Sequence, residues 1–180
     1  MFKSSKYKRL ESDYHKLEKE YEKIKSRLVS LLWYKERVKL VNNLLERYQI
    51  LGIAENNQRH KYYVCLDTPN NSVNISLRDS EQVNHNPRIY ANISFDNNKS
   101  EERNCYIIDI FAVDENVGNG TILLDHLCKY LKKMDIKKVR GRLASRDKED
   151  FDMLECFYKK NGFEVTFNTG KTEGYIEKLL

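Results

Sequence analysis

The first 50 residues contain neither proline nor glycine, so nothing in this stretch forces a helix to break. Apolar and aromatic side chains recur there at spacings that alternate between three and four residues: Tyr7, Leu10, Tyr14, Leu17, Tyr21, Ile24, Leu28 and Leu31. This is the heptad pattern of a coiled-coil seam, with tyrosine at three of its four a positions. We expect a long helix that packs on a second copy of the chain, giving a homodimer, or on its own globular domain or another partner.

A second apolar pattern, near the 3.6-residue period of a helix, covers residues 31–51. It predicts a helix packed on a sheet, either kinked at Leu31–Leu32 or continuous through it, with Gly52 as the C-terminal stop. The chain therefore divides into a helical arm, residues 1–54, and a globular domain, residues 55–180.

Beyond Gly52 the sequence shows short runs rich in Val, Ile and Tyr, separated by turns predicted at 69–71, 84–87 and 96–98. Strands are predicted at Lys61–Thr68, Ser72–Leu77, Arg88–Phe95 and Cys105–Val113, connected as an antiparallel meander. The later elements are expected to be a helix at Thr121–Met134, a strand at Lys137–Ala144, a helix at Glu149–Asn161 and a hairpin of Phe163–Phe167 with Gly174–Leu179. The predicted fold class is α/β, an α+β mixed sheet with helices on both faces, preceded by a long helical arm.

The basic character of the chain belongs to the arm. Net charge is +5, and residues 1–60 hold 14 Lys and Arg against 8 Asp and Glu. The arm could contact nucleic-acid phosphates, but acidic residues interleave with the basic ones, which favours a solvated coiled-coil flank. Mean hydropathy is −0.74, no apolar run approaches the ~20 residues of a membrane helix, and no signal peptide is visible, so we expect a cytoplasmic protein without a membrane partner.

The cysteines and histidines do not predict a metal site. The cysteines stand singly, without zinc-like spacing, and we expect reduced structural thiols at Cys65, Cys105, Cys128 and Cys156. The four histidines form no constellation either. No metal ion is expected.

The loop between the strand ending at Val113 and the helix starting at Thr121 is the first candidate site. Gly118 and Gly120 let the backbone approach a ligand closely, and the helix that follows directs its free N–H groups at the loop. This arrangement is typical of a phosphate or pyrophosphate site. A Walker loop is excluded because no Gly-Lys-Ser/Thr follows, and a dinucleotide fingerprint is excluded because position 123 is Leu.

A second motif reads Phe-Tyr-Lys-Lys-Asn-Gly-Phe at residues 157–163. Together the two motifs resemble the GNAT superfamily of acyl-CoA-dependent N-acyltransferases, in which a Gly-x-Gly/Ala phosphate loop precedes a helix and a later helix ends in Phe-Tyr-x-x-x-Gly-Phe. Gly118 and Gly120 match the two loop glycines, and the later motif is matched by Phe157, Tyr158, Gly162 and Phe163. The resemblance covers roughly residues 88–180. Glu115 stands where the family prefers Arg or Gln, and Phe151 where many relatives have a polar residue facing the cofactor.

The resemblance implies a GNAT-like acyl-CoA N-acyltransferase fold whose sheet splays beside the loop and holds acetyl-CoA. Backbone groups of the strand from Phe111 to Val113 would hold the pantetheine arm. The amides of Val117, Gly118, Asn119, Gly120 and Thr121 would hold the pyrophosphate of coenzyme A. Tyr158 would stand near the sulfur as general acid, since a phenol can donate a proton to a departing thiolate. The alternative for Tyr158 is a packed aromatic ring with a satisfied hydroxyl.

The general base is not given by the resemblance. Asp109, an acid in an apolar strand, is the candidate, because burial would raise its pKa; a structural Asp or a water-borne proton are the alternatives. The expected function is N-acetyltransfer from acetyl-CoA to a primary amine. The alternative is a non-catalytic CoA-binding or degenerate GNAT-like module whose basic coiled-coil arm mediates protein or nucleic-acid binding.

Overall fold

The computed structural model describes residues 5–79, 86–95 and 103–180. The chain divides into two compact units, residues 1–43 and 44–180. The turn predicted at 96–98 and the first half of the one predicted at 84–87 lie outside the described residues, as does His85. The turn at 69–71 is present, since the Ser72 N–H donates to the Pro69 carbonyl over 3.0 Å.

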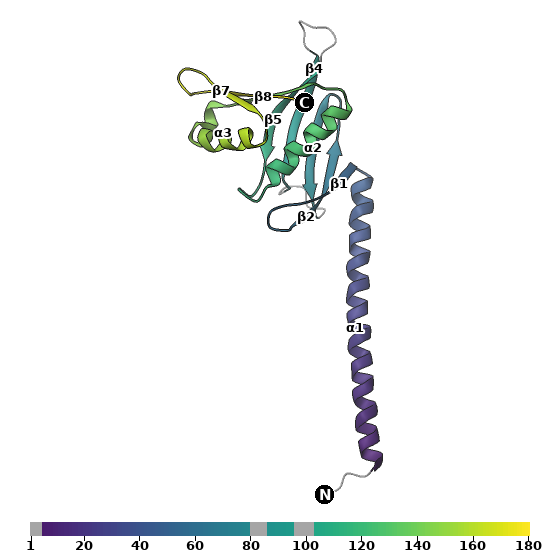
Figure 1. Cartoon of the computed structure of the whole chain (residues 1–180). Coiled ribbons are helices and arrows are strands. Elements are labelled where there is room, and N and C mark those ends of the chain that lie inside the picture. Colours follow the sequence, from purple (N-terminus) through teal and green to yellow (C-terminus); the bar gives the residue numbers. More distant parts are fainter. Residues whose placement is uncertain (1–4, 80–85, 96–102) are drawn as a thin grey trace. The chain divides into compact units, whose positions relative to one another are not determined.

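One helix, α1 (Ser5–Leu45), forms nearly all of the first unit (Figure 1). It runs through Leu31–Leu32 without interruption, so the continuous form of the predicted helix is confirmed. Its apolar side chains are exposed up to Val38. Among the described residues, no helix combines the length and apolar character that crossing a bilayer requires.

The second unit is built on a mixed sheet of eight strands in the order β1-β2-β3-β4-β5-β6-β8-β7 (Figure 1). The antiparallel meander comprises β1 (Gln49–Glu55), β2 (Lys61–Asp67), β3 (Ser72–Arg78), β4 (Arg88–Phe95) and β5 (Arg103–Phe111). The remaining elements are α2 (Asn119–Lys133), β6 (Lys138–Leu143), the 3₁₀ helix η1 (Ser145–Asp150), α3 (Phe151–Lys160), β7 (Glu164–Phe167) and β8 (Gly174–Leu179). The predicted α+β mixed sheet, and the long helix preceding it, are confirmed.

The residues around Gly52 are the main error of the sequence-based prediction. The helix ends at Leu45, and Gly52 lies inside β1, beside a register irregularity in the β1–β2 ladder. The predicted helix to Leu51 is therefore wrong beyond Leu45. Residues 49–54, assigned from sequence to the arm, belong with Glu55 to the edge strand of the sheet.

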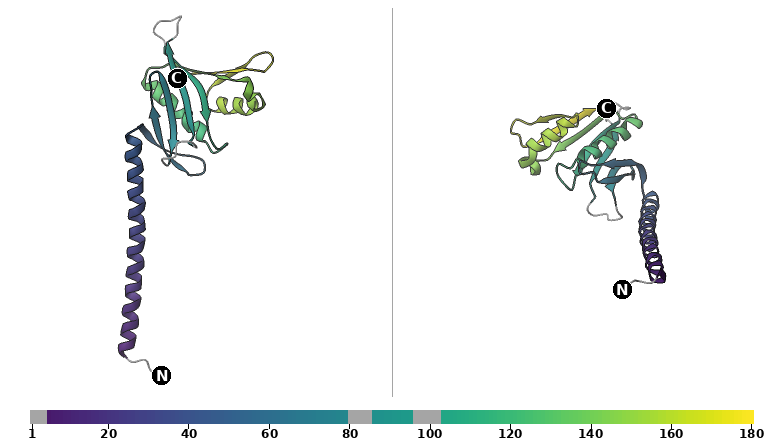
Figure 2. Two further views of the ribbon diagram at one scale, coloured as in Figure 1. Left: turned by 180° about the vertical axis from the view of Figure 1, so that it is seen from behind. Right: turned by 60° about the horizontal axis from the view of Figure 1, so that its bottom comes forward.

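One face of the sheet carries the core. The register places Ile75, Ala91 and Ile107 on this face, where α2 packs across β3, β4 and β5. α3 packs beside β7 (Figure 2). The rings of Phe151 and Phe167 lie 5.1 Å apart. Helix α2 connects β5 to β6, and α3 connects β6 to β7; both connections advance toward the same edge of the sheet. Right-handed crossovers that advance in the same direction place their helices on the same face. The expectation of helices on both faces is therefore wrong for residues 44–180 as described.

Candidate active site between strands β5 and β6

The site is created by two neighbouring strands that separate. β5 pairs in parallel with β6 from Asn104 to Ile107, but residues 109–111 pair only with β4 on the other side. The last residues of β6 pair instead with β8. A β-bulge at Ile108 lies where the separation begins, because Ala91 pairs with Ile107 and Tyr90 with Asp109. The sheet is therefore splayed at this end, as the family resemblance implied.

A cavity of about 1100 Å³ fills the splay. Its walls come from the separated ends of β5 and β6, the loop before α2, the first turn of α2, and α3. This volume slightly exceeds the ~300–1000 Å³ that is usual for small-molecule sites, so a ligand as large as a nucleotide thioester has room.

The loop glycines lie at the start of α2. Gly118 caps the helix with φ 90°, a left-handed conformation that favours glycine, and no side chain of the described residues caps this helix end. The first backbone hydrogen bond of α2 runs from the Ile122 N–H to the Gly118 carbonyl. The amides of residues 119–121 therefore lack acceptors within the helix. Gly118, Asn119, Gly120 and Thr121 line the cavity. The helix end thus offers free donors and a positive dipole end to an anion.

A side chain at either glycine would contact other protein atoms. A Cβ on Gly120 would stand 2.9 Å from Cζ of Phe157, and one on Gly118 would stand 3.1 Å from the side-chain amide of Asn57. Gly120 therefore allows α3 to pack closely on the start of α2. The sequence analysis ascribed both glycines to the ligand alone.

A buried amide fixes the loop. The Asn119 side chain donates to the Ala112 carbonyl at 3.1 Å and accepts from the Asn56 side chain at 3.2 Å. Asn56 and Asn119 are both buried, and the Asn57 N–H donates to the Val117 carbonyl over 2.9 Å. The β1–β2 turn thus holds the loop before α2 in place. The Asn119 side chain does this structural work, which leaves its backbone amide for a ligand.

Tyr158 stands on α3 with its ring packed edge-on against Phe157 and Phe163, at centroid distances of 5.1 and 5.6 Å. Only 6% of the residue is exposed, and it lines the cavity. Among the described residues, none hydrogen-bonds to its hydroxyl. Burial raises the pKa of Tyr158, and the negative charges of Asp109 and Asp147 raise it further. The phenol therefore keeps its proton at neutral pH.

Asp109 is less buried than the sequence predicted. Its side chain is 34% exposed, and it lies 3.5 Å from the guanidinium of Arg146. The expectation that Asp109 is buried is wrong, because the splay exposes this part of β5. Arg146 also lies 3.3 Å from the Asp147 carboxylate. Arg146 thus bridges the carboxylates of Asp109 and Asp147, and all three side chains border the cavity, which Tyr158 also lines.

Most of the residues proposed from sequence come together at the cavity, including Phe111, Val113 and Tyr158. Val113 has φ 69°, a left-handed conformation that is costly for a β-branched residue. Val117 is buried and does not line the cavity, so its side chain belongs to the core. Phe151 also lies in the core, with 1% exposed, and does not face the cavity, whereas Glu115 does line it.

Sequence reasoning missed several cavity-lining residues, among them Asn57, Arg88, Arg142, Arg146 and Asp147. None of them stands in a recognisable motif. Asn57 reaches the cavity only because β1 and β2 form a hairpin, which the sequence analysis did not predict. Arg146 and Asp147 lie in η1, which directly follows one of the two separating strands, and this position was their available signal.

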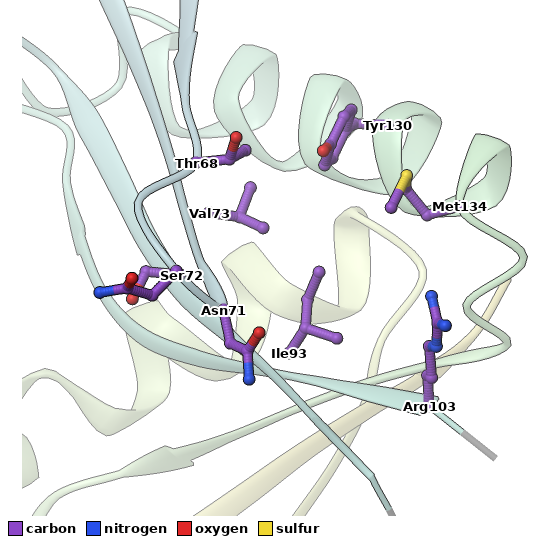
Figure 3. A pocket seen from close by; sticks show the side chains of 9 residues that line it. Thr68, Asn71, Ser72, Val73, Ile93, Arg103, Tyr130 and Met134 are labelled. Carbon is purple, nitrogen blue, oxygen red and sulfur yellow. The ribbon is translucent and has the colours of Figure 1, made fainter. Parts of the chain in front are cut away.

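A second cavity, of about 290 Å³, lies at the other end of α2 (Figure 3). It is lined by Thr68, Asn70, Asn71, Ser72, Val73, Ile93, Arg103, Tyr130 and Met134. Tyr130 and Met134 belong to the last turn of α2 or follow it, where the helix dipole is negative. This cavity is too small for a nucleotide and lies at the wrong helix end for a pyrophosphate.

All four cysteines are free thiols. Cys65, Cys105 and Cys128 are buried, and burial raises the pKa of Cys65 to about 11 and that of Cys105 to about 12. Cys156 is exposed on α3 and lines the large cavity. It is therefore the cysteine through which occupancy of the cavity can be measured.

The chain is similar to solved structures that include an acetyltransferase of the GNAT family and a protein in complex with acetyl-CoA. NAA60 from Arabidopsis thaliana, in complex with acetyl-CoA, is 15% identical with a TM-score of 0.45, and the match covers 63% of this chain and 77% of that one. A GNAT-family acetyltransferase from Streptococcus pneumoniae is 14% identical with a TM-score of 0.45, covering 63% and 70%. A domain from Methanocaldococcus jannaschii DSM 2661 is 22% identical with a TM-score of 0.38, covering 63% and 70%.

No family model matches the chain, and neither does any curated protein. At these TM-scores and identities, we base the functional proposal on the chain's own geometry.

Proposed function

We propose that the domain of residues 44–180 is an acetyl-CoA-dependent N-acetyltransferase that acylates a primary amine in the cytoplasm. One observation carries the proposal: the separation of β5 from β6 opens a large cavity that has an uncapped helix N-terminus and a buried phenol on its walls. The helix end suits a pyrophosphate, and the phenol suits a leaving thiolate. Coenzyme A carries both groups in one molecule.

The residues present fit this cosubstrate. Gly118, Asn119, Gly120 and Thr121 offer amides to the pyrophosphate, because the start of α2 lacks a side-chain cap among the described residues. The backbone of β5 near Phe111 and Val113 has no neighbour strand on the β6 side, so its polar groups are available to the amides of a pantetheine arm. Acetyl-CoA supplies the activated acyl group.

The reaction forms a C–N bond to the amine and breaks the C–S bond of the thioester. Tyr158 donates its hydroxyl proton to the departing thiolate, since a phenol is protonated at neutral pH and the raised pKa keeps it so. The amine must first lose a proton, and Asp109 is the carboxylate that we assign to this step. Asp109 and Asp147 also give a cationic ammonium group a favourable place beside Tyr158.

A second candidate is a non-catalytic CoA-binding module whose arm mediates protein or nucleic-acid binding. Glu115 favours it, because this carboxylate lines the cavity next to the loop where a phosphate would lie. The two candidates share the cosubstrate and differ in turnover. Release of free CoA thiol in the presence of an amine panel distinguishes them.

The test of cosubstrate binding uses position 121. Thr121 is exposed, and a glutamate there, in the first turn of α2, favours the helix dipole while repelling a pyrophosphate. Thr121→Glu should therefore leave the melting temperature of the free protein unchanged or higher and abolish its rise with acetyl-CoA. Thr121→Gln, which has nearly the same shape without the charge, should keep most of the rise. Gly120→Glu is less informative, because any side chain there meets Phe157.

A second readout comes from the native chain. Alkylation of Cys156 by iodoacetamide should slow when acetyl-CoA occupies the cavity, whereas the buried cysteines should react only on unfolding. An unmoved melting curve at millimolar acetyl-CoA, together with unprotected Cys156, would reject the cosubstrate assignment.

A further inference from the structure

The helical arm presents an apolar stripe that no described residue of its own unit covers. We call it the α1 seam: Tyr7, Leu10, Tyr14, Leu17, Tyr21, Ile24, Leu28 and Leu31, each between 56% and 68% exposed. At ~1.5 Å per residue the seam is roughly 37 Å long. Isolated helices of this length are marginal in water, and their stability comes from packing an apolar face. The seam therefore needs an occupant.

We propose that the occupant is a second copy of α1 that runs antiparallel to the first. In this arrangement the seam pairs with itself end to end. Its layers are Tyr7 with Leu31 of the second copy, Leu10 with Leu28, Tyr14 with Ile24, and Leu17 with Tyr21. All eight seam positions are used, and the following heptad position, Lys35, stays outside. Sliding the copies by one heptad would bring Lys35 opposite Leu10.

The composition of the layers decides the direction. A parallel dimer packs each a residue on the same residue of its partner, which would stack Tyr7, Tyr14 and Tyr21 on their own copies. Two large rings and two hydroxyls would then meet in each of three layers. The antiparallel dimer gives every tyrosine an aliphatic partner. Each hydroxyl can then reach the wet edge of the seam while the ring covers the aliphatic chain.

The charges beside the seam favour a second copy over other occupants. In the antiparallel register, Glu11 faces Lys25 of the second copy and Asp13 faces Arg27, and the two-fold axis repeats both contacts. Like charges meet at the centre, where Glu18 and Glu20 face their own copies. Opposite-sign contacts therefore outnumber like-sign ones, so the surface is self-complementary. A nucleic-acid backbone would instead face these carboxylates. A parallel dimer has the same balance of opposite-sign and like-sign contacts. The charges therefore favour a second copy as the partner, whereas the composition of the layers favours the antiparallel direction.

The test uses the full-length chain with Cys156→Ser, which removes the exposed native thiol. Light scattering first measures the oligomeric state, with a dimer expected. Leu10→Cys and Leu28→Cys proteins are then mixed under reducing conditions and oxidised. Because a disulfide requires Cα atoms closer than about 7 Å, this mixture should form at least ~10-fold more cross-linked dimer than Leu10→Cys alone. Val29→Cys replaces Leu28→Cys in the control, since Val29 lies next to Leu28 but outside the seam.

Each outcome decides the proposal. Cross-linking between positions 10 and 28, with little between positions 10 and 29, supports the antiparallel dimer. Strong cross-linking of Leu10→Cys with itself would show a parallel dimer and overturn the proposed direction. A monomer at ~100 µM would overturn self-association and leave the seam to a different protein or to the chain's own domain. The proposal goes beyond the acetyltransferase assignment, because none of these measurements depends on acetyl-CoA.

Discussion

Helices α1 and α2 both repeat leucine at helical spacing, yet they bury it to opposite extents. Leu127 of α2 is completely buried, whereas Leu17 of α1 is 67% exposed. The difference lies in what surrounds each helix within its own unit: α2 packs across β3, β4 and β5, whereas α1 is the only element described in its unit. The same amino acid therefore stabilises a fold in one region and is available for association in the other.

The tyrosines repeat the contrast. Tyr158 is enclosed by two phenylalanine rings beside a cavity, and its pKa is raised, while Tyr14 is 64% exposed on the arm. Burial gives one phenol a chemical environment that the other lacks. We therefore assign the chemistry to residues 44–180 and association to the arm.

The largest expected effect is on turnover, and it tests this division by comparing the same substitution at the two tyrosines. Tyr158→Phe keeps the ring packing and removes the hydroxyl, so turnover on an accepted amine should fall by ~10²–10⁴-fold while acetyl-CoA affinity stays nearly constant. The matched change Tyr14→Phe should leave turnover unaltered. Steady-state kinetics with the measured thiol release decides it. Equal rates for wild type and Tyr158→Phe would reduce Tyr158 to a packing residue.

The leucines give the next largest effect. Leu127→Ala removes a fully buried side chain from the core of the sheet domain and should lower the free energy of unfolding by ~2–5 kcal/mol. Leu17→Ala should change the unfolding of that domain by less than ~0.5 kcal/mol, because exposed substitutions are nearly neutral. Urea unfolding, followed by the circular dichroism of the sheet domain, measures the free energy of unfolding of both variants. Similar losses for the two variants would contradict the division between arm and domain.

The smallest effect concerns acid stability within the sheet domain. Hydrogen bonds from Arg140 and Lys138 lower the pKa of Glu177. A carboxyl whose pKa is lowered by folding stabilises the fold at pH values above its ordinary pKa of 4.5. This stabilisation is lost as the pH falls through the lowered pKa of the folded state. Glu177→Gln should therefore flatten the loss of stability between about pH 5 and 3, by less than ~1 kcal/mol because the pair is partly exposed.

The control for this experiment is Glu149→Gln in η1, an exposed carboxyl without an ion pair among the described residues. Its acid stability should follow the wild type. An arm substitution such as Glu18→Gln should also leave the acid unfolding of the sheet domain unchanged. A shift with either control would show that the acid limb arises elsewhere.

Much of the sheet was predictable, because its strands are short apolar runs between turn residues. Arg88–Phe95 and Gly174–Leu179 have the predicted ends. Strand β1 was not predictable in the same way. Its residues continue the helical apolar pattern of α1, and only hydrogen bonding to β2 makes them a strand. The local pattern and the long-range pairing disagree there, and the pairing decides.

The candidate site shows the same limit. The loop glycines and Tyr158 were found because they belong to motifs with a fixed spacing. The exposure of Asp109 was not, because alternation along a strand indicates a face but does not reveal where the next strand turns away. Asn57 and Asp147 reach the cavity through tertiary connections that leave no periodic trace in the sequence.

The hydrogen bond from Asn56 to Asn119 joins residues that lie 63 positions apart in the sequence. The loop before α2 therefore reaches its final form only after the β1–β2 hairpin and the strand β5 have assembled around it. Contacts of such long sequence separation form late in folding. A ligand that needs the ordered loop consequently stabilises a state beyond the folding barrier, so it slows unfolding and leaves the refolding rate almost unchanged.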